Sequence, residues 1–372
     1  MGQRFAAFIR FHEVNVKMKT LFYLGLLACV ISCQKANNTY GTTPTSPVLP
    51  GNFQVFNLVS DTASYMPSFL DTNLVDAWGL AINPKGIFWI AANGTGNAVV
   101  YDSTGKTLLG PLGIPFEGVA NGSSPSGAIF NATTDFTIPV VGQTALFVYS
   151  TENGTLTAWA PGLDTFATVV DNSAKGTVYK GLAWAVNGGA NYLYATDFRG
   201  GKIDVFDKNF APVSISFSDP GIPAGFGPFN IVNIGGQLYV TYAKLKGPDD
   251  MDDQAGPGNG YVDIFTPAGV LVKRFFSGGV LDSPWGLAQA PAGSGLPFHC
   301  ILVGNFGDGW INAFDSTGVY LGPLATSGTP IAVPGLWAIS FAANVIPGAS
   351  PSKLYFTAGP DGENQGLFGY IQ

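Results

Sequence analysis

The chain has 372 residues, of which 46% are hydrophobic and 11% are charged, and its formal net charge is −7. The apolar content excludes a disordered chain, and the lack of a basic stripe excludes nucleic-acid binding. The 50 glycines and 26 prolines are typical of a turn-rich all-β protein, and the length is sufficient for a large core.

The first segment of the chain is interpreted as a targeting sequence. Lys17 and Lys19 precede an apolar run over residues 21–31, which is too short to span a membrane and is typical of a signal peptide. The run ends in Val-Ile-Ser-Cys33, which resembles the bacterial lipobox, whose cysteine is lipidated after cleavage. Cys29 fits the same pattern after a shorter run. We expect lipidation at Cys33, with a plain signal peptide as the alternative.

Three regions follow from these signals. Residues 1–32 are an upstream extension plus the lipoprotein signal peptide, with Met18 as the real start. Residues 33–52 are rich in Asn, Thr, Ser, Pro and Gly, which predicts a flexible tether. Residues 53–372 remain for the folded domain.

Within this domain, a pattern of an aromatic or polar residue, a small residue and an apolar run returns six times. The residues at the small position are 48 to 56 positions apart along the chain. They are Gly79, Gly127, Gly181, Asn230, Gly286 and Ala338. A period near fifty with strand-like content predicts an all-β fold, a six-bladed β-propeller of four-stranded blades.

Each repeat contains further strand signals. Runs rich in aromatic and β-branched residues follow the opening run, as at 88–91 and 98–101, and the first five repeats continue into an outer strand such as 270–273. The sixth repeat stops after its third strand. The alternating segment 53–59 is therefore predicted to supply the missing outer strand of the last blade and to close the ring. Crowding near the axis explains the small residues.

The candidate site follows from this topology. Loops between second and third strands, and loops leading into first strands, gather on one face around the channel mouth. Polar residues concentrate there, and tryptophans open three of the first strands. The candidate ligand-binding residues are Trp78, Asn93, Glu152, Asn153, Asp197, Arg199, Trp285, Asn305, Trp337 and Asp361. Oxygen donors with aromatic walls suit a hard cation or a polar ligand such as a sugar. Alternatively, Asn and Asp after a strand are turn formers.

An acidic insertion in the fourth repeat is the second candidate. Its four carboxylates are Asp249, Asp250, Asp252 and Asp253. They repel one another unless they are solvated or bridged by a cation, so calcium is the cofactor that we consider here. The spacing matches no EF-hand pattern, and a solvated loop that partly covers the channel mouth is the alternative.

Catalytic motifs are missing from the domain. Its one histidine, His299, argues against zinc-site spacings and a Ser-His-Asp triad, and is expected to be structural or on the surface. Cys300 has no cysteine partner in the domain and is expected to be a buried structural thiol. No nucleophile elbow, Walker loop or dinucleotide fingerprint occurs.

The repeats resemble NHL-type propellers and, more closely, an uncharacterised family of secreted bacterial proteins. The resemblance runs from residue 57 to residue 372 and is carried by NLVSD (57–61), LVDAWGL (74–80), AGPGNGYVD (255–263) and DSPWGLA (282–288). Some members end in a PEP-CTERM sorting segment, which this chain lacks. The resemblance implies the fold and export. Calcium-dependent lactonases have similar propellers, and Glu152, Asn153 and Asp197 are compatible in type with their ligands.

Three hypotheses for function follow. The first is an envelope-anchored propeller that acts as a binding or scaffolding module for an unknown protein or glycan. The second is a calcium-dependent hydrolase or lactonase with its site at the channel mouth, and the third is a purely structural envelope protein. We expect membrane contact through the lipid anchor alone, in the periplasm or at the outer membrane. We also expect a monomer, because a closed ring has no free sheet edges.

Overall fold

The computed structural model describes residue 49 and residues 51–372. The signal segment, Cys29, Cys33 and most of the tether lie outside these residues. The helices of the described part are 3₁₀ turns of three residues each, at Ala63–Tyr65, Asn93–Thr95, Ser173–Lys175 and Ala342–Asn344. None of them is long and apolar enough to cross a lipid bilayer.

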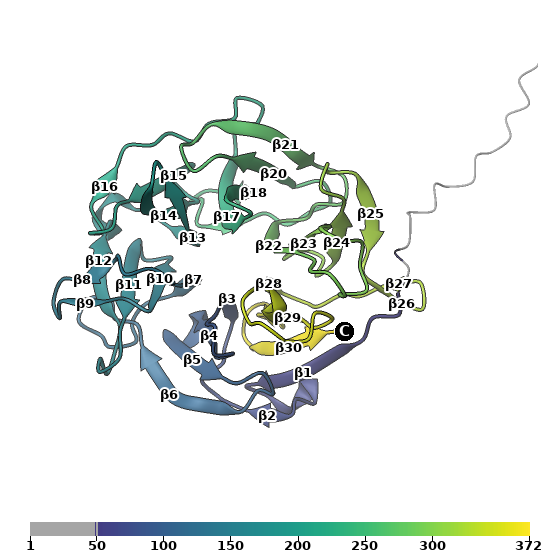
Figure 1. Ribbon diagram of the computed structural model, residues 1–372, viewed down its shortest axis with the longest axis horizontal. Coiled ribbons are helices and arrows are strands. Elements are labelled where there is room, and N and C mark those ends of the chain that lie inside the picture. The colour runs from purple at the N-terminus through teal and green to yellow at the C-terminus, as the bar shows by residue number, and fades with distance from the viewer. Residues whose placement is uncertain (1–48, 50) are drawn as a thin grey trace, which may run out of the picture. The chain divides into compact units, whose positions relative to one another are not determined.

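Six antiparallel sheets follow one another around a central axis, as the propeller prediction required (Figure 1). In blades 1 to 5 the strands run from the axis outward in chain order. Blade 1 is β3 (Ala77–Ile82), β4 (Phe88–Ala92), β5 (Asn97–Tyr101) and β6 (Thr107–Gly113). Blade 2 is β7 (Pro125–Phe130), β10 (Phe147–Thr151), β11 (Thr155–Trp159) and β12 (Ala167–Asp171). Blade 3 is β13 (Tyr179–Asn187), β14 (Ala190–Asp197), β15 (Lys202–Phe206) and β16 (Pro212–Val213).

The remaining blades follow the same plan with additions. Blade 4 is β17 (Phe226–Ile234), β18 (Gln237–Lys246), β20 (Gly260–Phe265) and β21 (Leu271–Ser277), with β19 (Asp252–Asp253) paired to β18. Blade 5 is β22 (Pro284–Gln289), β23 (Ile301–Asn305), β24 (Ile311–Phe314) and β25 (Tyr320–Pro323). Two short hairpins lie outside the blades, β8 (Thr137–Ile138) with β9 (Gln143–Thr144), and β26 (Ala325–Thr326) with β27 (Thr329–Pro330).

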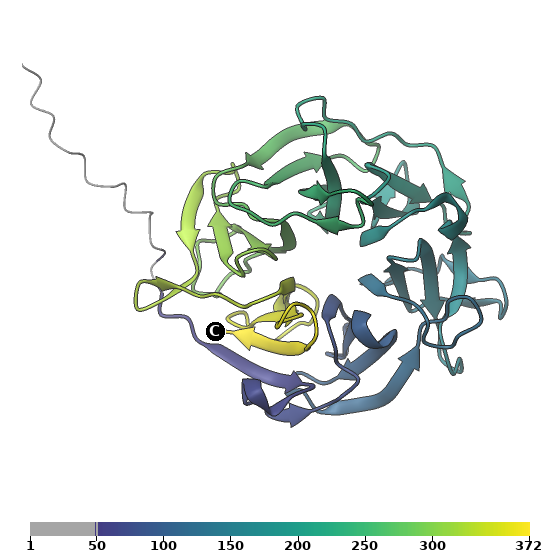
Figure 2. The ribbon, with the colours of Figure 1, turned by 180° about the vertical axis from the view of Figure 1, so that it is seen from behind.

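Blade 6 joins the two ends of the domain. It contains β28 (Leu336–Phe341), β29 (Leu354–Ala358), β30 (Leu367–Ile371) and the N-terminal strand β1 (Val55–Ser60). β1 pairs antiparallel with β30, with Val55 opposite Ile371, so the predicted closing strand is confirmed. Figure 2 shows the same closure from behind. A short strand that we did not predict, β2 (Phe69–Leu70), pairs parallel with β1 at the edge.

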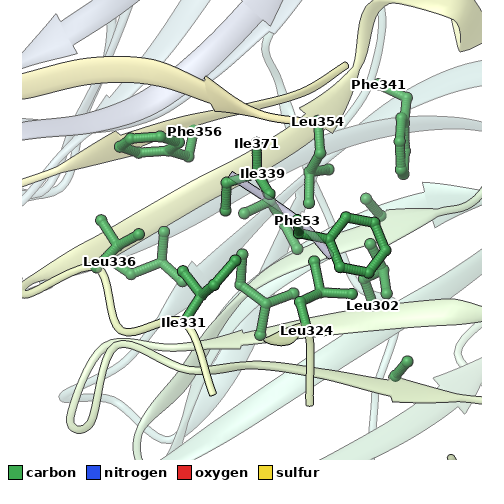
Figure 3. Close-up of a cluster of buried hydrophobic side chains, with 14 of the residues drawn as sticks. Phe53, Leu302, Leu324, Ile331, Leu336, Ile339, Phe341, Leu354, Phe356 and Ile371 are labelled. Carbon is green, nitrogen blue, oxygen red and sulfur yellow. The ribbon is translucent and has the colours of Figure 1, made fainter. Parts of the chain in front are cut away.

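The chain just before β1 is also anchored. The Phe53 side chain packs in a buried cluster with Leu302 of blade 5 and with Leu354 and Ile371 of blade 6 (Figure 3). The Phe53 amide donates a hydrogen bond to the Ala325 carbonyl oxygen at 3.1 Å. The apolar contact and the hydrogen bond together hold the closing segment between two blades.

Small residues allow neighbouring inner strands to approach closely. A Cβ atom on Gly79 would lie 2.3 Å from the Ser126 carbonyl oxygen, and one on Gly181 would lie 2.4 Å from Asn230 Oδ1. In the fourth repeat, Asn230 replaces glycine, and its Nδ2 donates a hydrogen bond to the Trp285 carbonyl oxygen at 2.7 Å. The expected crowding at the axis is therefore contact between one blade and the next.

Hydroxyl groups on second strands add bonds between blades. Thr196 Oγ1 accepts a hydrogen bond from the Gly181 amide at 2.7 Å and lies 3.3 Å from the Phe229 carbonyl oxygen in blade 4. Thr357 donates in the same way to the Trp78 carbonyl oxygen, which joins blade 6 to blade 1. The inner strands are thus held at a fixed spacing, and this spacing positions the residues at the mouth.

Candidate functional site at the channel mouth

Six buried side chains lie at the mouth end of the inner strands, and we call them the plug. Each precedes the small residue of one repeat, and each is buried. The plug consists of Trp78, Ser126, Lys180, Phe229, Trp285 and Trp337. The Trp78 and Trp337 rings stack with centroids 3.7 Å apart, and the Trp285 ring meets Trp337 edge-on at 5.9 Å. The three predicted tryptophans therefore contact one another inside the plug, and no more than 4% of any of them is exposed.

Lys180 carries a charge into the plug. Its side chain is 2% exposed, and Nζ forms an ion pair with Glu152 and lies 4.8 Å from the centre of the Trp78 ring. The other Glu152 oxygen accepts a hydrogen bond from Asn93 Nδ2 at 2.8 Å. Burial alone lowers the pKa of Lys180, but the Glu152 carboxylate and then Asp252 outweigh it and raise the pKa. Two of the predicted residues, Asn93 and Glu152, thus meet around a buried ammonium.

Asp76 holds two plug tryptophans in place. Its carboxylate accepts hydrogen bonds from Trp78 Nε1 at 2.7 Å and from Trp337 Nε1 at 3.1 Å. Burial and then the Glu363 carboxyl raise the pKa of Asp76 well above its usual value, against the pull of the two indoles. A Cβ atom on Gly359 would lie 2.1 Å from Asp76 Oδ1, so this glycine makes room for the carboxyl.

Further carboxyl groups surround Lys180. Burial, together with Glu152 and Asp252, raises the pKa of Glu363 to about 7 against the opposing effect of Lys180. Burial likewise raises the pKa of Asp253. Several carboxyl groups thus influence one another beside a single ammonium, and this arrangement favours retention of protons on the most buried acids.

Sequence reasoning did not identify Asp76, Lys180 or Glu363 as site residues. Each lies beside a residue or motif that was identified. Asp76 and Lys180 belong to the segments that open two of the repeats, and Glu363 follows Asp361 by two positions. For Lys180, the signal that was missed is an ionisable residue directly before the small position of a repeat, where the fold demands burial.

A cavity of about 430 Å³ opens beside the mouth. Its lining includes the predicted residues Glu152, Asn153 and Arg199, together with Phe116 and Glu117. Acidic, amide, guanidinium and aromatic groups thus face one space. Such a mixed lining can orient a polar ligand through several directed hydrogen bonds and one apolar contact.

Other predicted residues have local structural partners. Asn153 Oδ1 accepts a hydrogen bond from the Ser124 amide at 2.7 Å, and Asp197 accepts one from the Gly200 amide at 2.9 Å. Asn305 Nδ2 donates to the Val280 carbonyl oxygen at 2.8 Å. Asp361 is exposed in a turn with φ of 58°. These contacts match the alternative in which Asn and Asp shape turns.

The acidic insertion divides between two environments. Asp252 and Asp253 form β19, and Asp252 Oδ1 lies 3.8 Å from Lys180 Nζ. Asp249 is exposed, and Asp250 is half-buried with φ of 56°. Among residue 49 and residues 51–372, no three His, Cys, Asp or Glu side chains are placed to hold one metal ion. The calcium site stays a prediction.

His299 and Cys300 lie away from the mouth. The His299 ring contacts the exposed Phe298 ring with centroids 3.6 Å apart. Cys300 is buried and unpaired within the described part of the chain, as expected, and burial raises the pKa of its thiol to about 11. A low-pKa thiolate is the reactive form of cysteine, so this environment favours a structural role.

Solved structures with similar folds are propellers. An α-L-arabinanase from Penicillium chrysogenum complexed with arabinobiose superposes with a TM-score of 0.56 at 12% identity, over 87% of this chain and 98% of that one. Virginiamycin B lyase from Staphylococcus aureus superposes with a TM-score of 0.50 at 11% identity, over 86% of this chain and 99% of the lyase. At these identities the likeness concerns the fold alone.

Two sequence relatives are proteins of a virus. No family model matches the chain. The uncharacterized protein L690 of Acanthamoeba polyphaga mimivirus is 36% identical over 85% of this chain and 84% of its own length. The uncharacterized protein R648 of the same virus is 36% identical over 94% of this chain and 85% of its own length. This identity, sustained over most of each chain, shows that the protein belongs to the same family as L690 and R648.

Proposed function

We propose that the protein is a binding module that recognises a glycan at the channel mouth and the cavity beside it. The single observation that carries this proposal is the shared lining of Glu152, Asn153 and Arg199. Sugar hydroxyls both donate and accept hydrogen bonds, and this set offers amide and guanidinium donors beside carboxylate acceptors. Phe116 adds an apolar surface against which a sugar ring can pack.

A small, concave, mixed-polarity cavity favours a glycan over a protein as the ligand. Protein interfaces bury roughly 800 Å² on each partner and have cores depleted in charge, whereas this cavity has a volume of about 430 Å³ and charged walls. The arabinanase with arabinobiose shows that the fold can carry a sugar, and it adds nothing about these residues.

The test is a glycan array probed with the full chain, followed by titration calorimetry with the best ligand. Arg199→Ala removes an exposed lining group and should weaken binding roughly tenfold, as expected for a charged hydrogen bond. Lys85→Ala, an exposed change away from the cavity, should leave the affinity unchanged. Equal affinity of Arg199→Ala and the wild type would contradict the proposed site.

The second candidate is the calcium-dependent hydrolase or lactonase, favoured by Glu363. A carboxyl whose pKa is about 7 can donate a proton at neutral pH, and the ion-paired Glu152 is a carboxylate in the same cluster. Chromogenic glycosides and lactones, assayed with calcium and with EDTA, test this function. A hydrolase should lose the limb of its pH–rate profile near pH 7 in Glu363→Gln. Failure to turn over any substrate removes this candidate.

Anchoring in a bacterial cell envelope is the remaining part of the proposal. It is supported by the apolar run before Cys33 and by the resemblance to secreted bacterial propellers. Metabolic labelling with a palmitate analogue in a bacterial host tests it. Label should be lost in Cys33→Ser and retained in Cys29→Ser, whereas the reverse pattern would move the anchor to Cys29.

A further inference from the structure

The channel contains a second, larger cavity on the other side of the plug. Its volume is about 520 Å³, and inner strands or adjoining loops of all six blades line it. Its lining consists of 22 residues, none of which has an ionisable side chain. The walls are built by apolar residues that follow the small position, such as Leu80, Ile231 and Ile339.

The cavity has a closed end and an open end. Trp285, which is 4% exposed, is the one lining residue that also belongs to the plug, so it marks the inner end. At the other end Val345 is 37% exposed, Asn344 is exposed in the turn between β28 and β29, and Asn233 is exposed near the end of β17. Half-buried apolar residues such as Phe130 continue to this opening. An apolar surface that continues from a cavity to solvent gives an apolar ligand a path to the site.

Two polar residues of the lining are buried, and they differ in their partners: Asn230 donates to the Trp285 carbonyl oxygen. Trp285 Nε1 is buried and has no hydrogen-bond partner among the residues that the structure describes. The Trp78 and Trp337 indoles, in contrast, both donate to Asp76. Burial of a donor without a partner destabilises the folded protein, and a ligand that accepts a hydrogen bond from the donor can offset this effect.

We propose that this cavity binds one neutral, mostly apolar small molecule that carries a hydrogen-bond acceptor such as a carbonyl oxygen. The uncharged lining disfavours an ionised ligand, because burial of an unpaired charge is unfavourable. The volume lies within the roughly 300–1,000 Å³ that is typical of small-molecule sites. The Trp285 indole supplies the donor for the acceptor. The site lies beyond the plug and does not depend on the function proposed for the mouth.

The probe for the test is 6-propionyl-2-(dimethylamino)naphthalene, a neutral carbonyl-bearing fluorophore whose emission moves to shorter wavelength in apolar surroundings. Titration of the full chain should give a saturable shift with one site. Ala128→Trp places a large ring in the cavity from a half-buried position and should weaken binding at least about tenfold. Val319→Trp, an exposed change outside the cavity, should leave binding unchanged.

Two further measurements keep the outcome decisive. Val345→Asp places a charge at the exposed opening, where it cannot disturb the core, and should also weaken binding. Trp285→Phe should reduce the affinity for the carbonyl probe roughly 3- to 10-fold. The affinity for 2-ethylnaphthalene, measured by displacement of the probe, should change by less than about 2-fold. Trp310→Phe, a tryptophan outside the cavity, is the matched control.

No saturable shift with the wild-type chain would overturn the proposal. Wild-type affinity in both Ala128→Trp and Val345→Asp would overturn it as well, because the probe would then bind elsewhere. If Trp285→Phe lost the same affinity for both naphthalenes, the proposed hydrogen bond to the ligand would be wrong, and the ligand would need no acceptor.

Discussion

The two ends of the central channel are built by the same six inner strands and have opposite chemistry. At the mouth, Lys180 pairs with Glu152, and Asp76 accepts from two indoles. At the other end a cavity of about 520 Å³ is lined without any ionisable side chain. The difference arises within two residues of each strand, since plug residues precede the small position and cavity residues follow it. One short repeat therefore specifies two independent environments.

The largest predicted effect concerns the charge at the mouth. Lys180→Met should reduce the free energy of unfolding by about 3–5 kcal/mol, because it leaves the largely buried Glu152 carboxylate without its ammonium partner. Urea denaturation measures this. Lys202→Met removes a half-exposed lysine that also pairs with carboxylates, and should cost less than about 1 kcal/mol. If both variants were equally stable, the mouth would not be held together by its charges.

The second prediction concerns the small position that separates the two ends. Gly181→Ala should destabilise the domain by roughly 1–3 kcal/mol, because its Cβ would lie 2.4 Å from Asn230 Oδ1 in the next blade. Gly110→Ala is the matched control, since a Cβ there meets nothing within 4 Å. Thermal melts of the two variants compare them directly, and an unshifted midpoint for Gly181→Ala would argue against close contact between blades.

The third prediction concerns the pH dependence of stability that the mouth residue Glu363 causes. Burial raises the pKa of Glu363 from 4.5 to about 7, so the folded state binds a proton that the unfolded state releases. The stabilisation of the folded state by this proton is complete below pH 4.5 and is lost as pH rises to about 7. Over this window the unfolding free energy falls by up to about 1.4 kcal/mol per pH unit. Glu363→Gln should flatten the decline of the unfolding free energy over this window. Asp164→Asn, an exposed change, should retain the wild-type slope.

The smallest effect is expected at the open end. Val345→Gln should change the unfolding free energy by less than about 0.5 kcal/mol, because the side chain is 37% exposed at the rim of the cavity. Chemical denaturation of Val345→Gln and Lys180→Met in parallel compares the loss of unfolding free energy at the two ends of the channel. A loss as large as that of Lys180→Met would mean that both ends are equally constrained.

Much of the fold was predictable from sequence because its causes are local. The small residues recur every 48 to 56 positions, since each inner strand meets the next at the same height. The closing strand was predictable because the sixth repeat lacked an outer strand and residues 53–59 alternate. The short strand β2 was not predictable, since two residues carry no periodicity.

The site was predictable only in part, because its chemistry depends on loops from several blades. Asn93 and Glu152 were identified, but their meeting at Lys180 depends on blades 1, 2 and 3 together. The tryptophans were identified as mouth residues, yet their burial follows from six side chains that fill one cross-section. A single repeat contains no information on how the other five fill that space.

Ring closure also has a consequence for how the molecule is made. Val55 is synthesised long before its partner Ile371, so β1 has to wait for β30 while the ribosome completes the blades between them. Until then β1 lacks its antiparallel partner, and an unpaired strand edge is a template for pairing with other chains. Pairing of the earliest strand with the latest therefore makes closure depend on the complete domain: a chain that is shortened before β30 keeps its ring open and an aggregation-prone edge exposed.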